Sequence, residues 1–174
     1  QDRYGKTIMR HDTRRCMECV VDAGWRKQPV PTLPDNREQL TDPASAYQII
    51  TMLEGVVKRG TGRKLLQTGL VLAGKTGTTN DNTNAWFIGF SPDLVTGVFV
   101  GYDKPRPLGK RETGTTAAVP IFQYFMTKAL AEAPQIPFRR PDGVNLYPVH
   151  AEKGYQVKLS NPDAVMEVFK PGQS

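Results

Sequence analysis

The sequence of 174 residues has no long hydrophobic run, and its first residues, QDRYGKTIMR, lack the apolar core of a signal peptide. No stretch approaches the roughly 18 apolar residues that a membrane-spanning helix needs. We therefore expect any export signal or membrane anchor of the parent protein to lie outside this chain. Because 39% of the residues are hydrophobic, the composition excludes a disordered chain and predicts one domain with a real core.

Cysteine and histidine are scarce, with Cys16 and Cys19 the only cysteines and His11 and His150 the only histidines. The C-x-x-C pair lacks the β-α-β surroundings of a thioredoxin-like site, and structural zinc sites usually bring two such pairs. A site with His11 as third ligand and His150 as fourth is the less favoured alternative. Two ordinary thiols, or a local disulfide in an oxidising compartment, are favoured. We predict no metal and no cofactor.

Acidic residues are fewer than basic ones. The sequence has 23 Lys and Arg residues and 17 Asp and Glu residues, which gives a formal charge of +6. This excess favours anionic partners but does not choose between nucleic acid, lipid and cell-wall polymer. The basic stretch at residues 104–111 is interpreted first as a solvated turn. Contact with an anionic polymer or lipid surface is the alternative.

Residues 1–40 predict a hairpin followed by an irregular connection. Residues 2–6 predict a hairpin tip before a short strand at residues 7–9. The charged, proline-rich residues 11–40 predict an irregular connection. Trp25 lies within this connection. It is interpreted either as an exposed residue that contacts a partner or as a residue that packs locally.

The pattern becomes helical after residue 41. Asp42 can cap the first free amides, and Pro43 suits the first helical position. One apolar stripe then recurs at helical spacing until Gly60 and Gly62 end the element. The stripe consists of Ala46, Ile49, Ile50, Leu53, Val56 and Val57.

Three short extended runs follow, at residues 70–78, 85–90 and 95–102. The first is apolar up to Ala73 and polar from Lys75 onward. The links between the runs are short and rich in turn-forming residues. This spacing predicts an antiparallel meander.

A second helix is predicted over residues 117–131, with Pro120 near its first turn. The order helix, three strands, helix predicts an α+β fold in which helices cover an antiparallel sheet. Residues 135–174 are predicted to be mostly irregular, with one strand near residues 155–159. The strand aromatics are expected in the core, and these are Trp86, Phe87, Phe90 and Phe99.

The run GLVLAGKTGTT, at residues 69–79, fits two unrelated chemistries. Its first eight residues match the phosphate-binding pattern G-x-x-x-x-G-K-[ST]. Such a loop follows a strand and opens a helix at its Lys-Thr end. Here the variable positions, Leu-Val-Leu-Ala, are themselves strand-like, and GTTNDNTN after Thr76 is a poor helix start. An apolar strand ending at Asp103 keeps nucleotide binding as a disfavoured alternative.

Lys75-Thr76-Gly77 also fits the K-T-G element of serine acyl-transferring enzymes. That element borders a cleft, where Lys75 and the hydroxyls of Thr76 and Thr78 would face a bound carboxylate. Gly77 would let a substrate backbone approach closely because it has no side chain. A strand that turns polar after Ala73 fits this demand. The tripeptide alone is weak evidence, and a solvated strand end is the alternative.

The flanking sequence carries a resemblance. The string LAGKTGTTNDNTNAWFIGFSPDLVTGVFVGYDKP, with YQIITMLEGVVKRGTG before it and ETGTTAAVPIFQYFMTKAL after it, resembles the transpeptidase domain of class A penicillin-binding proteins of the 1A type, in its carboxy-terminal part. The resemblance covers residues 41–154, including PFRRPDGV at residues 137–144. Asn84 departs from the Asp expected in many relatives, so we assign no ion pair there. The resemblance implies a penicillin-binding or serine β-lactamase-like fold, with residues 41–134 as part of that domain.

The resemblance also implies roles for the K-T-G strand. In this family a serine attacks the carbonyl between the two terminal D-alanines of a peptidoglycan stem peptide, and a neighbouring stem peptide's amine resolves the acyl-enzyme. β-Lactams acylate the same serine. Lys75 would supply positive potential, and Thr76 and Thr78 would bind the substrate carboxylate, with Gly77 and Thr79 also on the substrate-binding strand. The N–H of Thr78 would be half of the oxyanion hole.

The nucleophile of this chemistry is missing. No serine of the chain has Lys three positions later or Asn two positions later, as the family's Ser-x-x-Lys and Ser-x-Asn motifs require. We therefore expect a carboxy-terminal piece of a larger enzyme that is inactive alone. Its expected partners are stem peptides, β-lactams and the remainder of the same protein, which would carry the serine. The serines are Ser45, Ser91, Ser160 and Ser174.

The same resemblance implies a parent at the periplasmic side of the bacterial inner membrane, held there by a segment outside this chain. No nucleic acid is expected as a partner. That parent would also contain a glycosyltransferase domain. A non-catalytic interaction module of the same fold is the main alternative, because the serine motif is absent. A serine β-lactamase and a nucleotide-binding enzyme rank below it.

Overall fold

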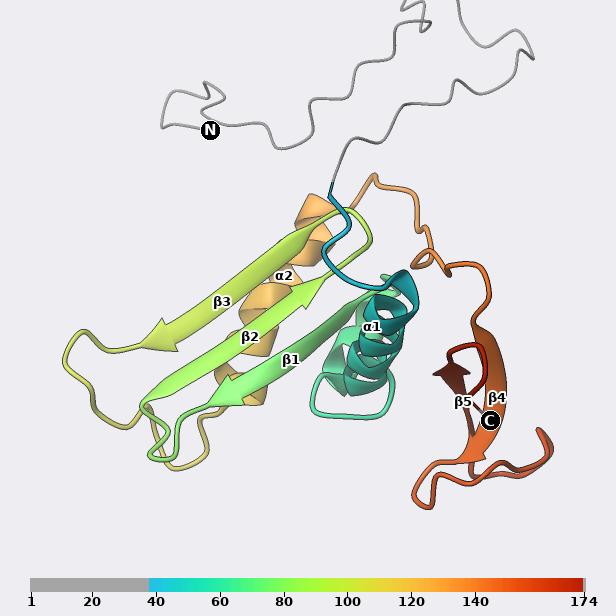
Figure 1. Cartoon of the computed structure of the whole chain (residues 1–174). Helices are drawn as coiled ribbons and strands as arrows, with labels where there is room; N and C mark the ends of the chain where they lie inside the picture. The colour runs from blue at the N-terminus through green and yellow to red at the C-terminus, as the bar shows by residue number, and fades with distance from the viewer. Residues whose placement is uncertain (1–37, 174) are drawn as a thin grey trace, which may run out of the picture. The chain divides into compact units, whose positions relative to one another are not determined.

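The computed structural model describes residues 38–173, and every described helix and strand lies in the unit of residues 41–174 (Figure 1). The hairpin tip and strand predicted near the start of the chain, Trp25 and both cysteines lie outside the described residues. In chain order the elements are α1 (Pro43–Lys58), the 3-10 turn η1 (Arg63–Thr68), β1 (Ala73–Thr78), β2 (Asn84–Phe90), β3 (Val95–Gly101), the π-helical turn η2 (Gly114–Ala118), α2 (Val119–Ala129), β4 (Asn145–His150) and β5 (Ala164–Phe169).

Helix α1 begins where the sequence predicts. The Asp42 carboxylate accepts hydrogen bonds from the N–H groups of Ala44 and Ser45, at 3.4 and 3.0 Å. Pro43 occupies the first turn, where its missing N–H costs nothing. The helix ends at Lys58, just before the predicted glycine stop.

Strands β1, β2 and β3 form the predicted antiparallel meander, in the order β1-β2-β3. Residues 70–72 precede β1 instead of belonging to it, contrary to the prediction. The reason lies in the partner strand, because β2 ends at Phe90, which pairs with Ala73. Apolar residues upstream of Ala73 therefore have no β2 residue to pair with.

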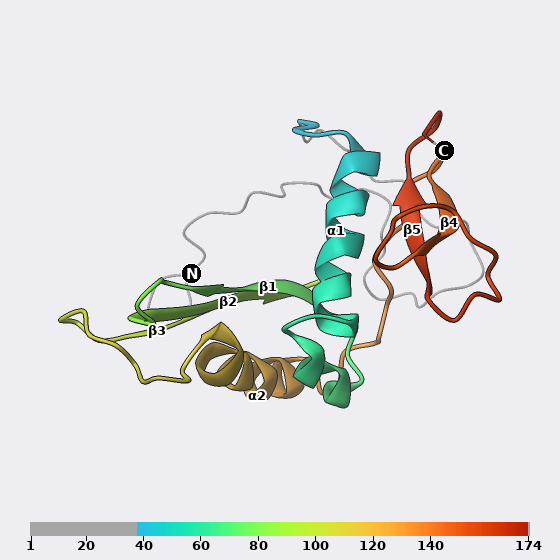
Figure 2. The ribbon, with the colours of Figure 1, turned by 90° about the horizontal axis from the view of Figure 1, so that it is seen from below.

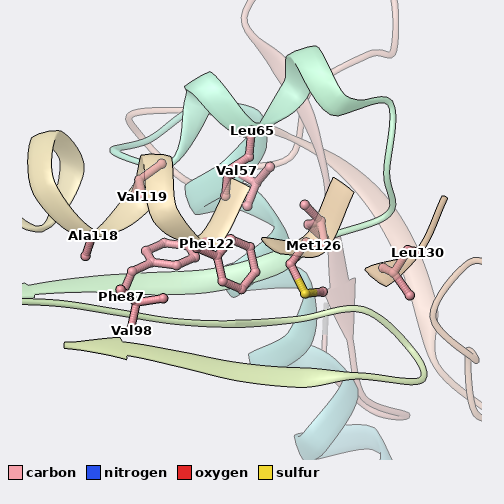
Figure 3. Close-up of a cluster of buried hydrophobic side chains, with 10 residues drawn as sticks. Val57, Leu65, Phe87, Val98, Ala118, Val119, Phe122, Met126 and Leu130 are labelled. Carbon is pink, nitrogen blue, oxygen red and sulfur yellow. The ribbon is translucent and has the colours of Figure 1, made fainter. Parts of the chain in front are cut away.

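Helix α2 covers one face of this sheet (Figure 2). Phe87 of β2 and Phe122 of α2 are fully buried between the two layers, and their rings meet edge to face with centroids 4.7 Å apart (Figure 3). This arrangement confirms the predicted helix-on-sheet layering. The other buried members of the cluster are Val57, Leu65, Leu72, Val98, Ala118, Val119, Met126 and Leu130.

Two glycines make room for these rings. A Cβ on Gly74 would lie 2.7 Å from the Phe87 ring, and a Cβ on Gly89 would lie 2.6 Å from Phe87 and 2.7 Å from Phe122. Gly74 and Gly89 are directly opposite each other on β1 and β2. The two aromatic rings therefore fill space that any side chain at these positions would occupy.

The opposite face of the sheet corrects part of the aromatic prediction. Phe87 lies in the core as predicted, but Trp86 and Phe99 are 43% and 52% exposed, so their predicted core placement is wrong. Side chains alternate along a strand, and these two point away from α2. Their rings contact each other, with centroids 4.7 Å apart. At the end of β2 on the same face, Phe90 is half-buried, with its ring 5.5 Å from that of Phe138 between centroids. Among the described residues, this face is therefore open around Trp86 and Phe99 and covered at Phe90.

Helix α2 starts later than predicted. The helix expected over residues 117–131 is Val119–Ala129, because residues 114–118 form the turn η2. The N–H of Thr113 donates to the hydroxyl of Thr116 at 2.8 Å, which closes a capping box at the start of η2. Pro120 lies in the first turn of α2, as predicted.

The last forty residues contain a sheet that the sequence does not predict. Strands β4 and β5 pair antiparallel, from Asn145 opposite Phe169 to His150 opposite Ala164. The strand expected over residues 155–159 is wrong, since only Gln156 forms an isolated bridge there. Asparagine and proline inside β4 hide it from a propensity argument.

Strand β5 packs against α1. Val168, Val144 and Ala44 are buried together, with Tyr47 beside them. Three polar contacts flank this second core and hold the strand on the helix. Gln48 Nε2 donates a hydrogen bond to the carbonyl of Val168 at 2.9 Å. Two ion pairs complete the set, Arg59 with Glu167 at 3.2 Å and Lys170 with Asp42 at 2.9 Å.

Replacing Gly89 by Ala is expected to lower the free energy of unfolding by about 1–3 kcal/mol, because the added methyl group overpacks the core. The matched control is Gly97→Ala on β3, where a Cβ would meet its nearest atom, in Ile88, at 3.9 Å. That variant should keep its stability. Urea unfolding of the chain followed by circular dichroism measures both, and equal stability of the two variants would contradict the packing argument.

The Asp42 carboxylate should make the attachment of β5 sensitive to strong acid. The Lys170 ammonium, followed by the Ser45 hydroxyl and N–H, holds the pKa of Asp42 well below its usual range. A carboxyl group whose pKa is lowered on folding stabilises the folded state at pH values above its ordinary pKa of about 3.9. This stabilisation is lost as the pH falls through the pKa of the folded state. Phe169, next to Lys170, is in a hydrogen-bonded pair with Asn145, so its amide reports the attachment of β5. We expect its protection to persist at about pH 4 and to fall only in stronger acid.

Two variants distinguish the ion pair of Asp42 with Lys170 from the role of Asp42 as the N-cap of α1. Asp42→Asn keeps a capping oxygen but loses the ion pair with Lys170, so Phe169 should lose this acid transition while α1 stays intact. Asp42→Ala loses both and should also fray the start of α1. Hydrogen exchange followed by NMR reads each segment separately, and an acid profile in Asp42→Asn that matches the wild type argues against the ion pair.

Candidate functional site

Strand β1, which carries Lys75-Thr76-Gly77, is one of the two outer strands of the meander (Figure 1). Just beyond it, the N–H of Thr79 donates to the carbonyl of Asn84 at 3.2 Å. Antiparallel strands alternate between hydrogen-bonded and non-hydrogen-bonded pairs, so Gly77 also directs its backbone groups toward β2. Thr76 and Thr78 direct theirs toward the outer edge. The K-T-G strand thus presents backbone donors and acceptors along an edge.

Lys75 is exposed and brings positive charge to that edge. Its side chain starts on the sheet face opposite α2, level with Ile88. The ammonium then turns back, and Nζ donates to the carbonyl oxygen of Thr76 at 3.0 Å. Because that carbonyl faces the outer edge, the cation lies beside the backbone groups of the strand.

The hydroxyls of Thr76 and Thr78 are each held by a residue from another element. Thr76 Oγ1 lies 3.0 Å from Oγ1 of Thr61, which follows α1. Thr78 Oγ1 accepts a hydrogen bond of 3.0 Å from the N–H of Gly114, the first residue of η2. Thr61 and Gly114 were not predicted as neighbours of the strand, because neither carries a motif of its own.

Gly114 sits so close to the sheet that no other residue fits there. A Cβ would lie 2.5 Å from the carbonyl oxygen of Trp86 and 2.9 Å from that of Gly77, and neither backbone atom can yield. The start of η2 therefore touches the K-T-G strand directly. This contact fixes the partner of the Thr78 hydroxyl.

Thr79 lies in the turn after β1. Its hydroxyl oxygen accepts from the N–H groups of Thr83 and Asn84, both at 3.0 Å, and contacts the Thr83 hydroxyl at 2.8 Å. The structure therefore brings Lys75, Thr76 and Thr78 together along the edge and uses the side chain of Thr79 to close the turn.

Two of the serines have local structural contacts. The Ser91 hydroxyl accepts from the N–H groups of Asp93 and Leu94, at 3.2 and 3.1 Å, in the link between β2 and β3. The Ser45 hydroxyl donates to Asp42 at 2.8 Å and accepts from Lys170 at the start of α1. Both hydroxyls are engaged in backbone capping or the hairpin attachment.

The described residues contain neither a metal-site cluster nor a helix suited to cross a membrane. Within residues 38–173, no three His, Cys, Asp or Glu side chains gather as a metal site would need. His150 lies on β4 with its ring 5.4 Å from that of Tyr155, while Cys16, Cys19 and His11 lie outside the described residues. None of the described helices has the length and apolar character to cross a membrane.

The phosphate-loop interpretation of residues 69–76 does not fit the fold. Lys75 and Thr76 lie in the middle of β1, and the chain continues through a turn into β2. A phosphate-binding loop would instead open a helix at these two residues and point its N–H groups at the anion. The strand geometry fits the K-T-G alternative.

Comparison with known families agrees with that choice. The family model described as the penicillin binding protein transpeptidase domain matches residues 19–127. The match spans α1, the three-stranded meander and most of α2.

Curated relatives and a solved structure extend the likeness. The chain is 44% identical over 171 residues to penicillin-binding protein 1A of Rickettsia bellii, covering 98% of this chain and 21% of that protein. It is 41% identical over 138 residues to penicillin-binding protein 1A of Pseudomonas aeruginosa, covering 79% and 17%. The crystal structure of penicillin-binding protein 1A from Haemophilus influenzae matches with a TM-score of 0.63 and 28% identity, over 74% of this chain and 21% of that one.

The chain thus spans about a fifth of the length of these relatives. Its edge strand, its helix-covered meander and its sequence agree with one family throughout the matched region. The chain belongs to the penicillin-binding protein transpeptidase domain family, with relatives of the 1A type.

Proposed function

We propose that this chain forms one wall of the active site of a peptidoglycan D,D-transpeptidase whose nucleophilic serine lies outside it. The observation that carries the proposal is the outer edge of β1, where the Lys75 ammonium lies beside backbone groups of Thr76. Family membership supports the reaction type, and the absence of Ser-x-x-Lys from the sequence supports a serine supplied by another segment.

The edge of β1 suits an extended peptide. Alternate residues of an outer strand offer N–H and C=O groups in the pattern that another strand would use, so a stem peptide can lie along it. Lys75 and the hydroxyls of Thr76 and Thr78 would then attract the carboxylate at the end of that peptide. Gly77, which has no side chain, would let the peptide approach closely.

The N–H of Thr78 would act on the reacting carbonyl. It points toward the outer edge, by the alternation that directs the N–H of Thr79 to β2. An N–H in this place can donate to the oxygen that becomes negative in the tetrahedral intermediate. Removal of one such donor typically slows a reaction by about 10²–10³.

The proposed reaction has two halves. The serine oxygen bonds to the carbonyl carbon of the penultimate D-alanine, the peptide bond to the terminal D-alanine breaks, and that residue leaves with a proton on its new amine. The amine of a second stem peptide then attacks the ester, and the serine takes back a proton. Lys75 would hold the leaving residue's carboxylate and favour the proton transfers by its positive charge. A β-lactam would stop after the first half.

The parent enzyme is proposed to lie at the periplasmic side of the bacterial inner membrane and to contain a glycosyltransferase domain as well. The relatives named penicillin-binding protein 1A are about five times longer than this chain, which leaves room for both the serine segment and such a domain. This chain alone is proposed to be inactive.

Fluorescent penicillin tests the proposal. We expect a covalent band on the parent polypeptide that contains residues 1–174, or on a companion chain that supplies the serine, and no band on the 174-residue chain alone. A denaturing gel beside an intact mass reads both results. A parent of confirmed mass that stays unlabelled would favour a non-catalytic module of the same fold, and labelling of the chain alone would place a nucleophile within it.

A pair of substitutions tests the role of the Thr78 N–H. Thr78→Ala removes the hydroxyl and keeps the N–H, whereas Thr78→Pro removes both. Proline should fit, since the N–H at this position faces away from β2 and forms no ladder bond. Acylation of the parent should be about 10²–10³ slower in Thr78→Pro than in Thr78→Ala. Equal rates in the two variants would remove this N–H from the oxyanion hole.

A further inference from the structure

Thr61 lies in the turn between α1 and η1, outside every motif in the sequence. Its hydroxyl oxygen is 3.0 Å from the hydroxyl oxygen of Thr76, fifteen positions later in the chain. Both side chains have solvent contact, with Thr61 exposed and Thr76 half-buried. The pair therefore lies at an accessible part of the K-T-G strand.

The backbone around Thr61 is held on both sides. The N–H groups of Gly60 and Gly62 donate to the same carbonyl oxygen, that of Val56 on the last turn of α1, each at 3.0 Å. The carbonyl of Gly62 in turn accepts from the N–H of Leu65, which is fully buried. The Thr61 hydroxyl is thus placed by the end of a helix and by the core rather than by a free loop.

The two threonine hydroxyls of the strand differ in how their hydrogens are directed. Thr78 Oγ1 accepts from a backbone N–H, which can only donate, so the single hydrogen of Thr78 must point elsewhere. In the Thr61–Thr76 pair either oxygen can be the donor. The direction of that bond decides whether the hydrogen of Thr76 is available to a ligand.

We infer that Thr61 is a positioning residue that makes Thr76 a donor to the substrate carboxylate. This inference rests on the proposed function of the strand. A carboxylate only accepts hydrogen bonds, so Thr76 must give its one hydrogen to the anion and use a lone pair to accept from Thr61. Two hydroxyls that donate in series polarise each other, which strengthens the bond to the anion. Thr61 acts on the ligand only through Thr76.

The inference predicts an effect that depends on the charge of the ligand. Without the Thr61 hydroxyl, Thr76 loses its donor and binds an anion less well. A ligand without the carboxylate gains little from this series of donors and should hardly respond. A general loss of structure would weaken both ligands alike.

The test uses Thr61→Val, which replaces the hydroxyl by a methyl group of similar size, and Thr61→Ser, which keeps the hydroxyl. In the parent enzyme, the rate of acylation by benzylpenicillin should fall about 3- to 10-fold in Thr61→Val, as expected for the loss of one hydrogen bond. The rate with its methyl ester should change less than about 2-fold. Thr61→Ser should restore the rate with benzylpenicillin.

A second measurement, on the 174-residue chain, separates this inference from the proposed function. The probe is N-acetyl-D-alanyl-D-alanine, with the corresponding amide as the ligand without a carboxylate. NMR should show shifts at the Thr76 amide that depend on the carboxylate, and an apparent Kd raised about 3- to 10-fold in Thr61→Val. Thr61→Ser should bind like the wild type.

The outcomes are distinct. If the parent is acylated and Thr61→Val reacts like Thr61→Ser with both β-lactams, the role of Thr61 is overturned and the proposed function stands. If the parent is not acylated, the proposed reaction fails, and the dipeptide decides on Thr61 by itself. A carboxylate-dependent shift that Thr61→Val weakens then supports the inference, and the absence of such a shift at Thr76 overturns it.

Discussion

The contact between Phe87 and Phe122 fixes the position of everything else in the meander. The two rings are fully buried, and they meet only because Gly74 and Gly89 leave the sheet surface empty beneath them. A buried phenylalanine of this kind typically contributes about 3–5 kcal/mol against its replacement by alanine. Since stability is a small difference between large terms, loss of either buried side chain would remove a large fraction of the net stability.

The same contact lies directly beside the candidate site in the sequence. Gly74, which makes room for the Phe87 ring, directly precedes Lys75 on β1. On the same face of the strand, Gly114 brings η2 against the carbonyls of Gly77 and Trp86, and α2 continues from η2. The core and the site are therefore not separate layers. A shift of α2 would move the turn that holds the Thr78 hydroxyl.

Local chemistry explains which parts of the fold could be predicted from the sequence. Asp42 and Pro43 mark the start of α1 by capping rules that involve only adjacent residues. The apolar run at residues 85–90 predicts a strand, but because both faces of it are apolar, it does not say which face a helix covers. For this reason Phe87 was placed correctly, whereas Trp86 and Phe99 were not.

Long-range pairing explains most of what could not be predicted. Strand β4 contains Pro148 and is defined by its partner β5 and not by its composition. The residues before Ala73 look like a strand, yet β2 ends opposite Ala73 and leaves them unpaired in the meander. At the site, the K-T-G motif is local and visible. Thr61 and Gly114 reach the strand only through the turns after α1 and before α2, which no local pattern encodes.

The outer edge of β1 also bears on how two copies of this polypeptide could meet. An outer strand with unpaired backbone groups can pair with the same strand of another molecule, and such pairing is a common start of aggregation. A lysine at the edge opposes it, because joining two such strands would bring like charges together and desolvate them. Lys75 has its ammonium beside the carbonyl of Thr76, directly at the edge. The lysine proposed to bind the substrate carboxylate is therefore also well placed to keep two copies of the chain apart.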